Sequence, residues 1–135
     1  MLLTPRLTFW SLGYGLLIWF EAALTIRFLG NYIFVPDRLL WMAIIFAGTA
    51  VLAFAIGWFY FHWFQTTPAQ RAASALLICA VGLLGDTLVL MQPALFFPGM
   101  TKEQIAWFGA WFAWAYGVGL LSGLWPRWLY GVPLE

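Results

Sequence analysis

The stretch LLWMAIIFAGTAVLAFAIGWFYF, residues 39–61, contains no charged side chain and decides the fold class. An apolar run of more than about 18 residues is long enough to cross the hydrocarbon core of a bilayer as an α-helix. The chain contains three further runs of similar character. We therefore expect an all-α polytopic membrane protein with a single domain, residues 1–133, and interpret residues 134–135 as a cloning scar. The expected four-transmembrane-helix bundle has spans at about 7–29, 38–64, 68–91 and 102–125.

The composition excludes the other broad classes of protein. Hydrophobic residues make up 64% of the 135 residues and charged residues only 8%, whereas soluble domains carry about 25% charged residues. The formal net charge is +1, and no cluster of Lys and Arg offers a surface for nucleic acid. The single cysteine, Cys79, precludes an internal disulfide. We expect an integral membrane protein whose main partner is lipid.

Capping signals mark the starts of the expected helices and agree with the hydropathy. Thr67 and Gln70 have the spacing of a capping box, in which each residue's side chain bonds the backbone N–H of the other. Thr101 and Gln104 repeat this spacing at the fourth span. The other expected signals are helix caps at Thr4 and Asp37 and a helix stop at Gly30.

Basic residues near the span ends favour one orientation, because Lys and Arg are more common on the cytoplasmic side of a membrane. Arg6, Arg71 and Arg127 lie on the side that holds both termini, against Arg38 and Lys102 on the other side. We therefore expect both termini to be cytoplasmic. The apolar, proline-broken connection between the third and fourth spans is expected to lie along the opposite membrane interface.

Two carboxylic acids, Glu21 and Asp86, interrupt the apolar spans. At a rise of about 1.5 Å per residue, the two side chains fall at nearly the same depth, slightly to the outer side of the midplane. A charged side chain near the bilayer centre costs at least about 2.5 kcal/mol, so such groups are usually paired, protonated or functional. These acids are the main candidates for a site.

Small and polar residues recur at helical spacing and indicate which helix faces point inward. In the third span Asp86 shares its face with Gly82, and in the first span Glu21 shares its face with Tyr14. In the fourth span we expect Tyr116 to face inward and most tryptophans to meet lipid. The expected inward residues there are Ala106, Gly109, Ala113, Tyr116, Leu120 and Gly123, and the tryptophans are Trp107, Trp111, Trp114 and Trp125.

The roles of the charged groups stay open at this point. The two acids could share one proton, because burial and a neighbouring carboxylate both disfavour the charged form. They could also form only a hydrogen bond between helices that fixes the packing. Arg27 lies about 120° round the helix from Glu21 and could extend to the outer headgroups or reach Asp86. If Arg27 holds Asp86 ionised, Glu21 remains as the carboxyl that carries a proton.

The tryptophans and the single histidine give weaker signals. Tryptophan is common at membrane interfaces, and an aromatic cage for an organic cation is an alternative use. Trp19 and Trp58 fit the interfacial belt least well. His62 alone does not provide a multi-histidine metal or haem site. We expect no cofactor, and enzymatic activity is the least supported class.

Several short motifs point to a known family. They are Arg27-x-x-Gly30-Asn31 at the end of the first span, Gly85-Asp86 in the third, Phe97-Pro98 in the connection that follows, and Phe108-Gly109-Ala110 and Trp114-Ala115-Tyr116 in the fourth. With these motifs the chain resembles an uncharacterised bacterial family of small four-helix integral membrane proteins. The resemblance implies the four-span topology. We expect the protein to lie in the bacterial inner membrane. The resemblance draws attention to Arg27 and Asp86, and it implies no activity.

We predict that the protein binds or transports a small cationic or proton-coupled ligand in an outward-facing cavity. Glu21 and Asp86 would form its acidic floor, Arg27 would act as a counter-charge, and Tyr116 and Tyr14 would line it. The alternative is a non-enzymatic scaffold or accessory subunit whose buried acids only fix helix packing. Isosteric neutralisation of the acids abolishes function in the first case and lowers stability in the second. A homodimer is compatible with so small a bundle.

Overall fold

The computed structural model describes residues 3–124 of the chain, and every element assigned there is a helix. Trp125, Arg127 and residues 134–135 lie outside the described residues. Four of the helices in residues 3–124 are long and apolar enough to cross a membrane. The all-α four-helix fold is therefore confirmed. The helices are α1 (Pro5–Ile33), α2 (Leu39–Trp63), α3 (Pro68–Met91), the short α4 (Pro93–Phe96) and α5 (Lys102–Leu124).

Both capping boxes form as expected. Thr67 Oγ1 accepts a hydrogen bond from the N–H of Gln70 at 3.4 Å, and the Gln70 side chain accepts one from the N–H of Thr67 at 3.0 Å. Thr101 and Gln104 make the same pair of bonds at 3.2 and 2.9 Å. Thr4 caps α1 by accepting from a backbone N–H in the first turn. These bonds satisfy amides that have no partner within their own helix.

Two expected helix boundaries are wrong. α1 does not stop at Gly30 but continues to Ile33. Gly30 is buried, and a Cβ atom built there would lie 2.7 Å from the sulfur of Met100, so this glycine serves a close approach between helix and connection. Asp37 does not cap α2, because the N-cap residue is Arg38 and its side chain makes no capping bond.

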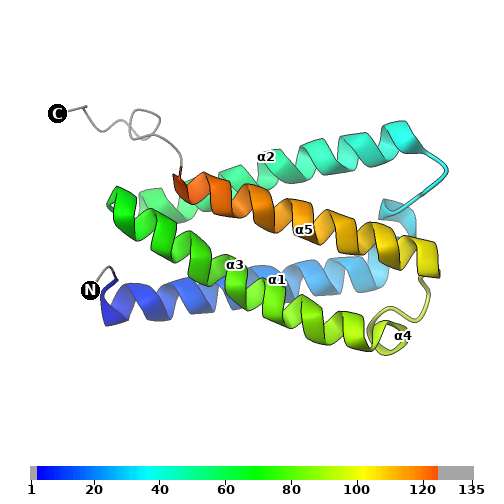
Figure 1. Cartoon of the computed structure of the whole chain (residues 1–135), viewed down its shortest axis with the longest axis horizontal. Helices are drawn as coiled ribbons and strands as arrows, with labels where there is room; N and C mark the ends of the chain where they lie inside the picture. The colour runs from blue at the N-terminus through cyan, green and yellow to red at the C-terminus, as the bar shows by residue number, and fades with distance from the viewer. Residues whose placement is uncertain (1–2, 125–135) are drawn as a thin grey trace.

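The four long helices pack in the order α1, α3, α5, α2, and the ring is not closed between α1 and α2. Figure 1 shows α2 along the upper edge of the view and α5 below it, with α3 crossing in front of α1 toward α4 at the lower right. Near one end of the bundle, the hydroxyls of Ser11 and Tyr60 share a hydrogen bond of 2.8 Å. Near the other end, Trp41 Nε1 donates to the carbonyl oxygen of Ile33 at 3.0 Å. α1 and α2 are therefore joined at both ends and separate in the middle.

Small residues allow the helices that do pack to approach closely. A Cβ atom at Gly15 of α1 would lie 2.7 Å from the backbone oxygen of Ile78 in α3. A Cβ atom at Gly123 of α5 would lie 2.5 Å from the Cβ atom of Ala75 in α3. Membrane helices without a hydrophobic drive between them pack on such residues. α3 takes part in both of these contacts and is the most buried of the four long helices.

Two groups of buried side chains fill the ends of the bundle. The first, which we call the loop-end cluster, lies where residues 34–38 and α4 connect the helices; its buried members are Ile26, Phe34, Met42, Val89, Phe97 and Phe108. The second, the terminal-end cluster, lies near the start of α1; its buried members are Leu7, Tyr60, Phe61 and Ala75.

Candidate functional site

A cavity of about 250 Å³ lies among α1, α2, α3 and α5. Its wall includes Ile26 and Phe108 of the loop-end cluster and Phe61 and Ala75 of the terminal-end cluster, so these clusters border it at opposite ends. Most of the wall is apolar. The polar side chains that line it include Tyr14, Glu21, Thr25, Thr49, Asp86 and Tyr116.

Asp86 is buried in the wall of this cavity, with 6% of its surface exposed. Its Oδ1 accepts a hydrogen bond from Trp19 Nε1 at 3.1 Å, and its Oδ2 accepts one from the Tyr116 hydroxyl at 2.8 Å. Both carboxylate oxygens therefore have a donor, and the donors come from α1 and α5. Asp86 connects three helices through one side chain.

Two glycines of α3 make room for these donors. A Cβ atom at Gly85 would collide with the indole of Trp19, and a Cβ atom at Gly82 would collide with the ring and hydroxyl of Tyr116. Each glycine thus admits one aromatic ring to the acid beside it. Gly82, Gly85 and Asp86 of α3 form a single packing site with the two aromatic rings. We call these five residues, Trp19, Gly82, Gly85, Asp86 and Tyr116, the aspartate clamp.

The sequence predicted part of the aspartate clamp. Asp86, Gly82 and Tyr116 were expected on inward faces, and the structure brings them together. The contact between Trp19 and Asp86 was missed. A signal for it exists, because Trp19 stands four residues after Gly15 and seven before Ile26, on the buried face of α1.

Glu21 is placed differently from Asp86. Its side chain is exposed, lines the cavity and accepts a hydrogen bond from Thr25 Oγ1 at 2.9 Å. Glu21 and Trp19 are two residues apart and therefore about 200° apart around the helix. Because Trp19 faces α3, Glu21 lies on a different part of the cavity wall from Asp86, and the hydrogen bonds of the two carboxyls within residues 3–124 go to different partners. The two acids do not form the shared-proton pair that was considered from the sequence.

Arg27 reaches neither Asp86 nor a carboxylate elsewhere in the described part of the chain. Its Nη1 donates to the carbonyl oxygens of Leu95 and Phe96 at 3.2 and 2.8 Å. These carbonyls belong to the last residues of α4, where helix geometry leaves them without intrahelical partners. Arg27 therefore fastens the connection between α3 and α5 to α1, a role that sequence reasoning did not consider.

Tyr14 lies at the terminal end of the cavity. Its hydroxyl donates to the carbonyl oxygen of Ile56 at 3.2 Å, and its ring lies 4.9 Å from that of Tyr60, centroid to centroid. The Tyr60 hydroxyl is in turn hydrogen-bonded to Ser11. These hydrogen bonds join α1 to α2 at the terminal end of the cavity. The inward position that the sequence predicted for Tyr14 is consistent with them.

The expected rotation of α5 is partly wrong. Ala106 and Ala113 are exposed, whereas Trp111 lines the cavity and donates to Thr49 Oγ1 at 2.7 Å. Trp114 is exposed but donates to the carbonyl oxygen of Phe46 at 2.9 Å. An indole N–H in apolar surroundings needs an acceptor, and α2 provides one at each position. Large rings fill the space between α5 and α2 around Trp111 and Trp114, whereas Gly57 of α2 lets Ser122 of α5 approach closely further along.

Comparison with known families assigns the chain to one of them. A family of unknown function, DUF5367, matches residues 33–129. The chain belongs to this family. The expected membership of an uncharacterised family is thereby confirmed. No curated protein and no solved structure matches the chain.

The part that matches the DUF5367 model includes some of the site residues and not others. Asp86, Gly82, Gly85 and Tyr116 lie within residues 33–129. α1, which carries Glu21 and the other candidates of the first span, lies almost wholly before the matched segment. Three of the five members of the clamp therefore come from one helix of the family's segment, and a fourth from α5.

Proposed function

We propose that this integral membrane protein binds a small cationic ligand in the cavity among its four helices, with Glu21 as the anionic contact and with protonation of Glu21 coupled to release. The cytoplasmic position of both termini, the bacterial inner membrane and a role in transport belong to the same proposal. The observation that carries it is the exposed Glu21 carboxylate on the wall of an otherwise largely apolar cavity.

The surroundings of Glu21 favour a cation as its partner. Thr25, one turn further along α1, is the hydrogen-bond donor that Glu21 has among the described residues. One neutral hydroxyl does not balance a carboxylate at this depth in a bilayer, where an unpaired charge costs several kcal/mol. The carboxyl must therefore be protonated or meet a cation. Exchange between these two states is the basis for coupling to protons.

The other predicted site residues have supporting roles in this proposal. Asp86 and Tyr116 bond each other and hold the wall of the cavity, so they position the site rather than contact the ligand. Tyr14 borders the cavity at its terminal end. Arg27 is engaged by α4 and is not a counter-charge for either acid.

A scaffold or accessory subunit is the second candidate, and the aspartate clamp favours it. Asp86 bonds side chains from two other helices, which is what a purely structural acid would do. The two candidates make different demands on Glu21. A scaffold needs no charge at the cavity, whereas a cation site does.

Infrared difference spectroscopy on protein in lipid bilayers tests the proposal. A panel of quaternary ammonium ions is added, and the carboxyl bands are compared between the wild-type protein and Glu21→Gln. We expect at least one ion to perturb a carboxyl band that Glu21→Gln lacks, while Glu103→Gln, which removes an exposed acid at the start of α5, keeps the response. If no ion perturbs the band of Glu21, the proposal is wrong.

The same measurement has an expected dependence on pH. A carboxylate attracts a cation and a neutral carboxylic acid does not, so cation binding at a carboxyl site is expected to weaken as the pH falls. Other titratable groups face the same cavity, namely Asp86, Tyr14, Tyr116 and Cys79. Glu21→Gln should therefore be compared with Asp86→Asn, and the pH dependence should disappear only in the first. Binding that is equally strong at all pH values would contradict the coupling.

A further inference from the structure

We place the opening of the cavity on the side of the bundle between α1 and α2, because these two helices do not pack against each other as the other neighbours do. Both clusters of buried residues border the cavity, one at each end. α1 and α2 do not pack along their middle sections, and the exposed side chains of Glu21 and Leu52 both line the cavity there. A route between these helices leads into the bilayer rather than into water.

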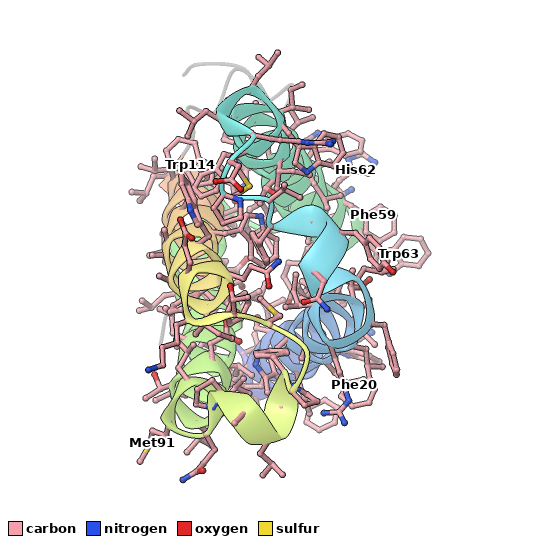
Figure 2. All side chains as sticks on the ribbon, turned by 90° about the vertical axis from the view of Figure 1, so that its right-hand side faces the viewer. Phe20, Phe59, His62, Trp63, Met91 and Trp114 are labelled. Atoms are coloured by element: carbon pink, nitrogen blue, oxygen red, sulfur yellow. The ribbon has the colours of Figure 1, made fainter. Side chains whose placement is uncertain are left out.

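The side of the bundle that holds this opening is strongly apolar. Phe20 of α1 and Phe59 and Trp63 of α2 project from the same side, opposite Met91 and Trp114 (Figure 2). The three rings are exposed by 56%, 52% and 71%. A molecule that approaches the opening must therefore already be dissolved among acyl chains.

The interior of the cavity suits an alkyl chain or a small ring system. Near the opening its wall carries small and branched apolar residues, among them Ile18 and Ala22 of α1 and Ala53 of α2. An apolar cavity of about 150 Å³ accommodates a benzene ring. A volume of about 250 Å³ therefore has room for several more methylene groups.

The opening itself suits a cationic head. Glu21 provides a carboxylate there, and the Trp111 and Trp19 rings line the same cavity. Arg27, the nearest basic residue of α1 in sequence, is engaged with α4 and does not neutralise Glu21. An anionic lipid would be repelled at this position, and a neutral alcohol would gain no ion pair.

We infer that the ligand is a cationic amphiphile, which enters from the bilayer between α1 and α2, inserts its apolar chain among the four helices and holds its ammonium group against Glu21. This inference rests on the proposed function and narrows it in two ways. It names the class of ligand, an alkylammonium with an apolar chain, and it names the route of entry.

Photolabelling in nanodiscs of zwitterionic phosphatidylcholine tests the inference. The probe is decyltrimethylammonium with a diazirine at the end of its chain, and adducts are located by mass spectrometry of peptides. We expect adducts on cavity-lining residues of α1, α2 and α3, and at least a tenfold loss of these adducts in Glu21→Gln. Glu103→Gln should label like the wild type, because Glu103 lies in the first turn of α5, outside the cavity.

Competition on the wild-type protein separates this inference from the broader proposal. Unlabelled decyltrimethylammonium should remove the cavity adducts, whereas equal concentrations of tetramethylammonium or decanol should not. If tetramethylammonium competes as well as the amphiphile, the inference is wrong while a cation site at Glu21 stands. If the adducts are spread over lipid-facing positions and do not depend on Glu21, both are wrong.

The route of entry is tested by narrowing the opening from each side. Ala22→Trp on α1 and Leu52→Trp on α2 place large rings on lining residues, and each should reduce cavity labelling at least fivefold. Ala110→Trp is the matched control, because Ala110 is exposed on α5 and does not line the cavity. If one variant does not fold, the other decides. Labelling equal to the wild type in a folded variant would overturn entry between α1 and α2.

Discussion

The two intramembrane acids occupy opposite situations in the same bundle. Asp86 is buried, and donors from two other helices satisfy both of its oxygens. Glu21 is exposed on the cavity wall with a donor from its own helix. The difference between the two acids lies in which way each helix turns its side chain. An acid whose two oxygens both accept hydrogen bonds from other helices stabilises the fold. An acid without such bonds is available to a ligand.

The largest expected effect comes from removing Asp86. Asp86→Ala leaves the Trp19 N–H and the Tyr116 hydroxyl buried without their acceptor, and each orphaned donor costs about 1 to 3 kcal/mol. We expect a loss of about 3 kcal/mol in the free energy of unfolding, measured by titration with sodium dodecyl sulfate and circular dichroism. The matched control is Thr87→Ala, since Thr87 is exposed and bonds only within α3. Equal stability of the two variants would show that the clamp is not structural.

A methyl group at Gly85 should have the next largest effect. Gly85→Ala drives a Cβ atom into the Trp19 indole, and overpacking of this kind costs about 1 to 3 kcal/mol. Gly48→Ala is the control, because a Cβ atom there meets nothing within 4 Å; it should be neutral or slightly stabilising. Adding Trp19→Phe to Gly85→Ala should recover part of the lost stability. The absence of any recovery would mean that the glycine serves another contact.

Glu21→Gln should have the opposite effect to Asp86→Ala, with little change in stability and a large loss of ligand binding. We expect the free energy of unfolding to change by less than about 0.5 kcal/mol, since exposed substitutions away from packed features usually have small effects. Binding of decyltrimethylammonium should weaken at least tenfold, which corresponds to about 1.4 kcal/mol. Calorimetry in nanodiscs measures the binding. A variant that is destabilised as strongly as Asp86→Ala would place Glu21 in the packing rather than at a site.

The starts of α1, α3 and α5 were predictable from the sequence because capping is local, whereas the end of α1 and the start of α2 were predicted wrongly. The pair of Thr67 and Gln70 needs only four consecutive residues, and its bonds form as expected. Longer-range uses of the same residues were not predictable. Gln104, for example, completes a capping box at α5 and also donates to the carbonyl oxygen of Phe34 at 2.9 Å, which depends on where α1 ends.

The rotation of each helix about its axis was harder to predict. A transmembrane helix is apolar on all sides, so periodicity identifies its packed face only weakly. On α3 the small residues identify the packed face, because the neighbouring helices approach closely there. The inward position of Asp86 could therefore be predicted from its place on that face. On α5 the rule gave the wrong face for Ala113, because Trp111 fills a wider space beside α2. The position of Glu21 beside the opening could not be foreseen without knowing that α1 and α2 separate.

The smallest expected effect concerns Arg27. Arg27→Gln shortens the side chain and removes the guanidinium that bonds the α4 carbonyls, and a hydrogen bond between membrane segments is worth about 0.6 kcal/mol on average. The bundle should therefore keep its stability within about 1 kcal/mol, while the connection around α4 becomes more accessible. A cysteine introduced at Gly99 should react faster with a water-soluble maleimide in this background than in Arg38→Gln. Arg38 is also exposed, but its side chain makes no capping bond. If Arg27→Gln instead weakens amphiphile binding as much as Glu21→Gln does, the arginine belongs to the binding site, and the contrast between the two acids needs revision.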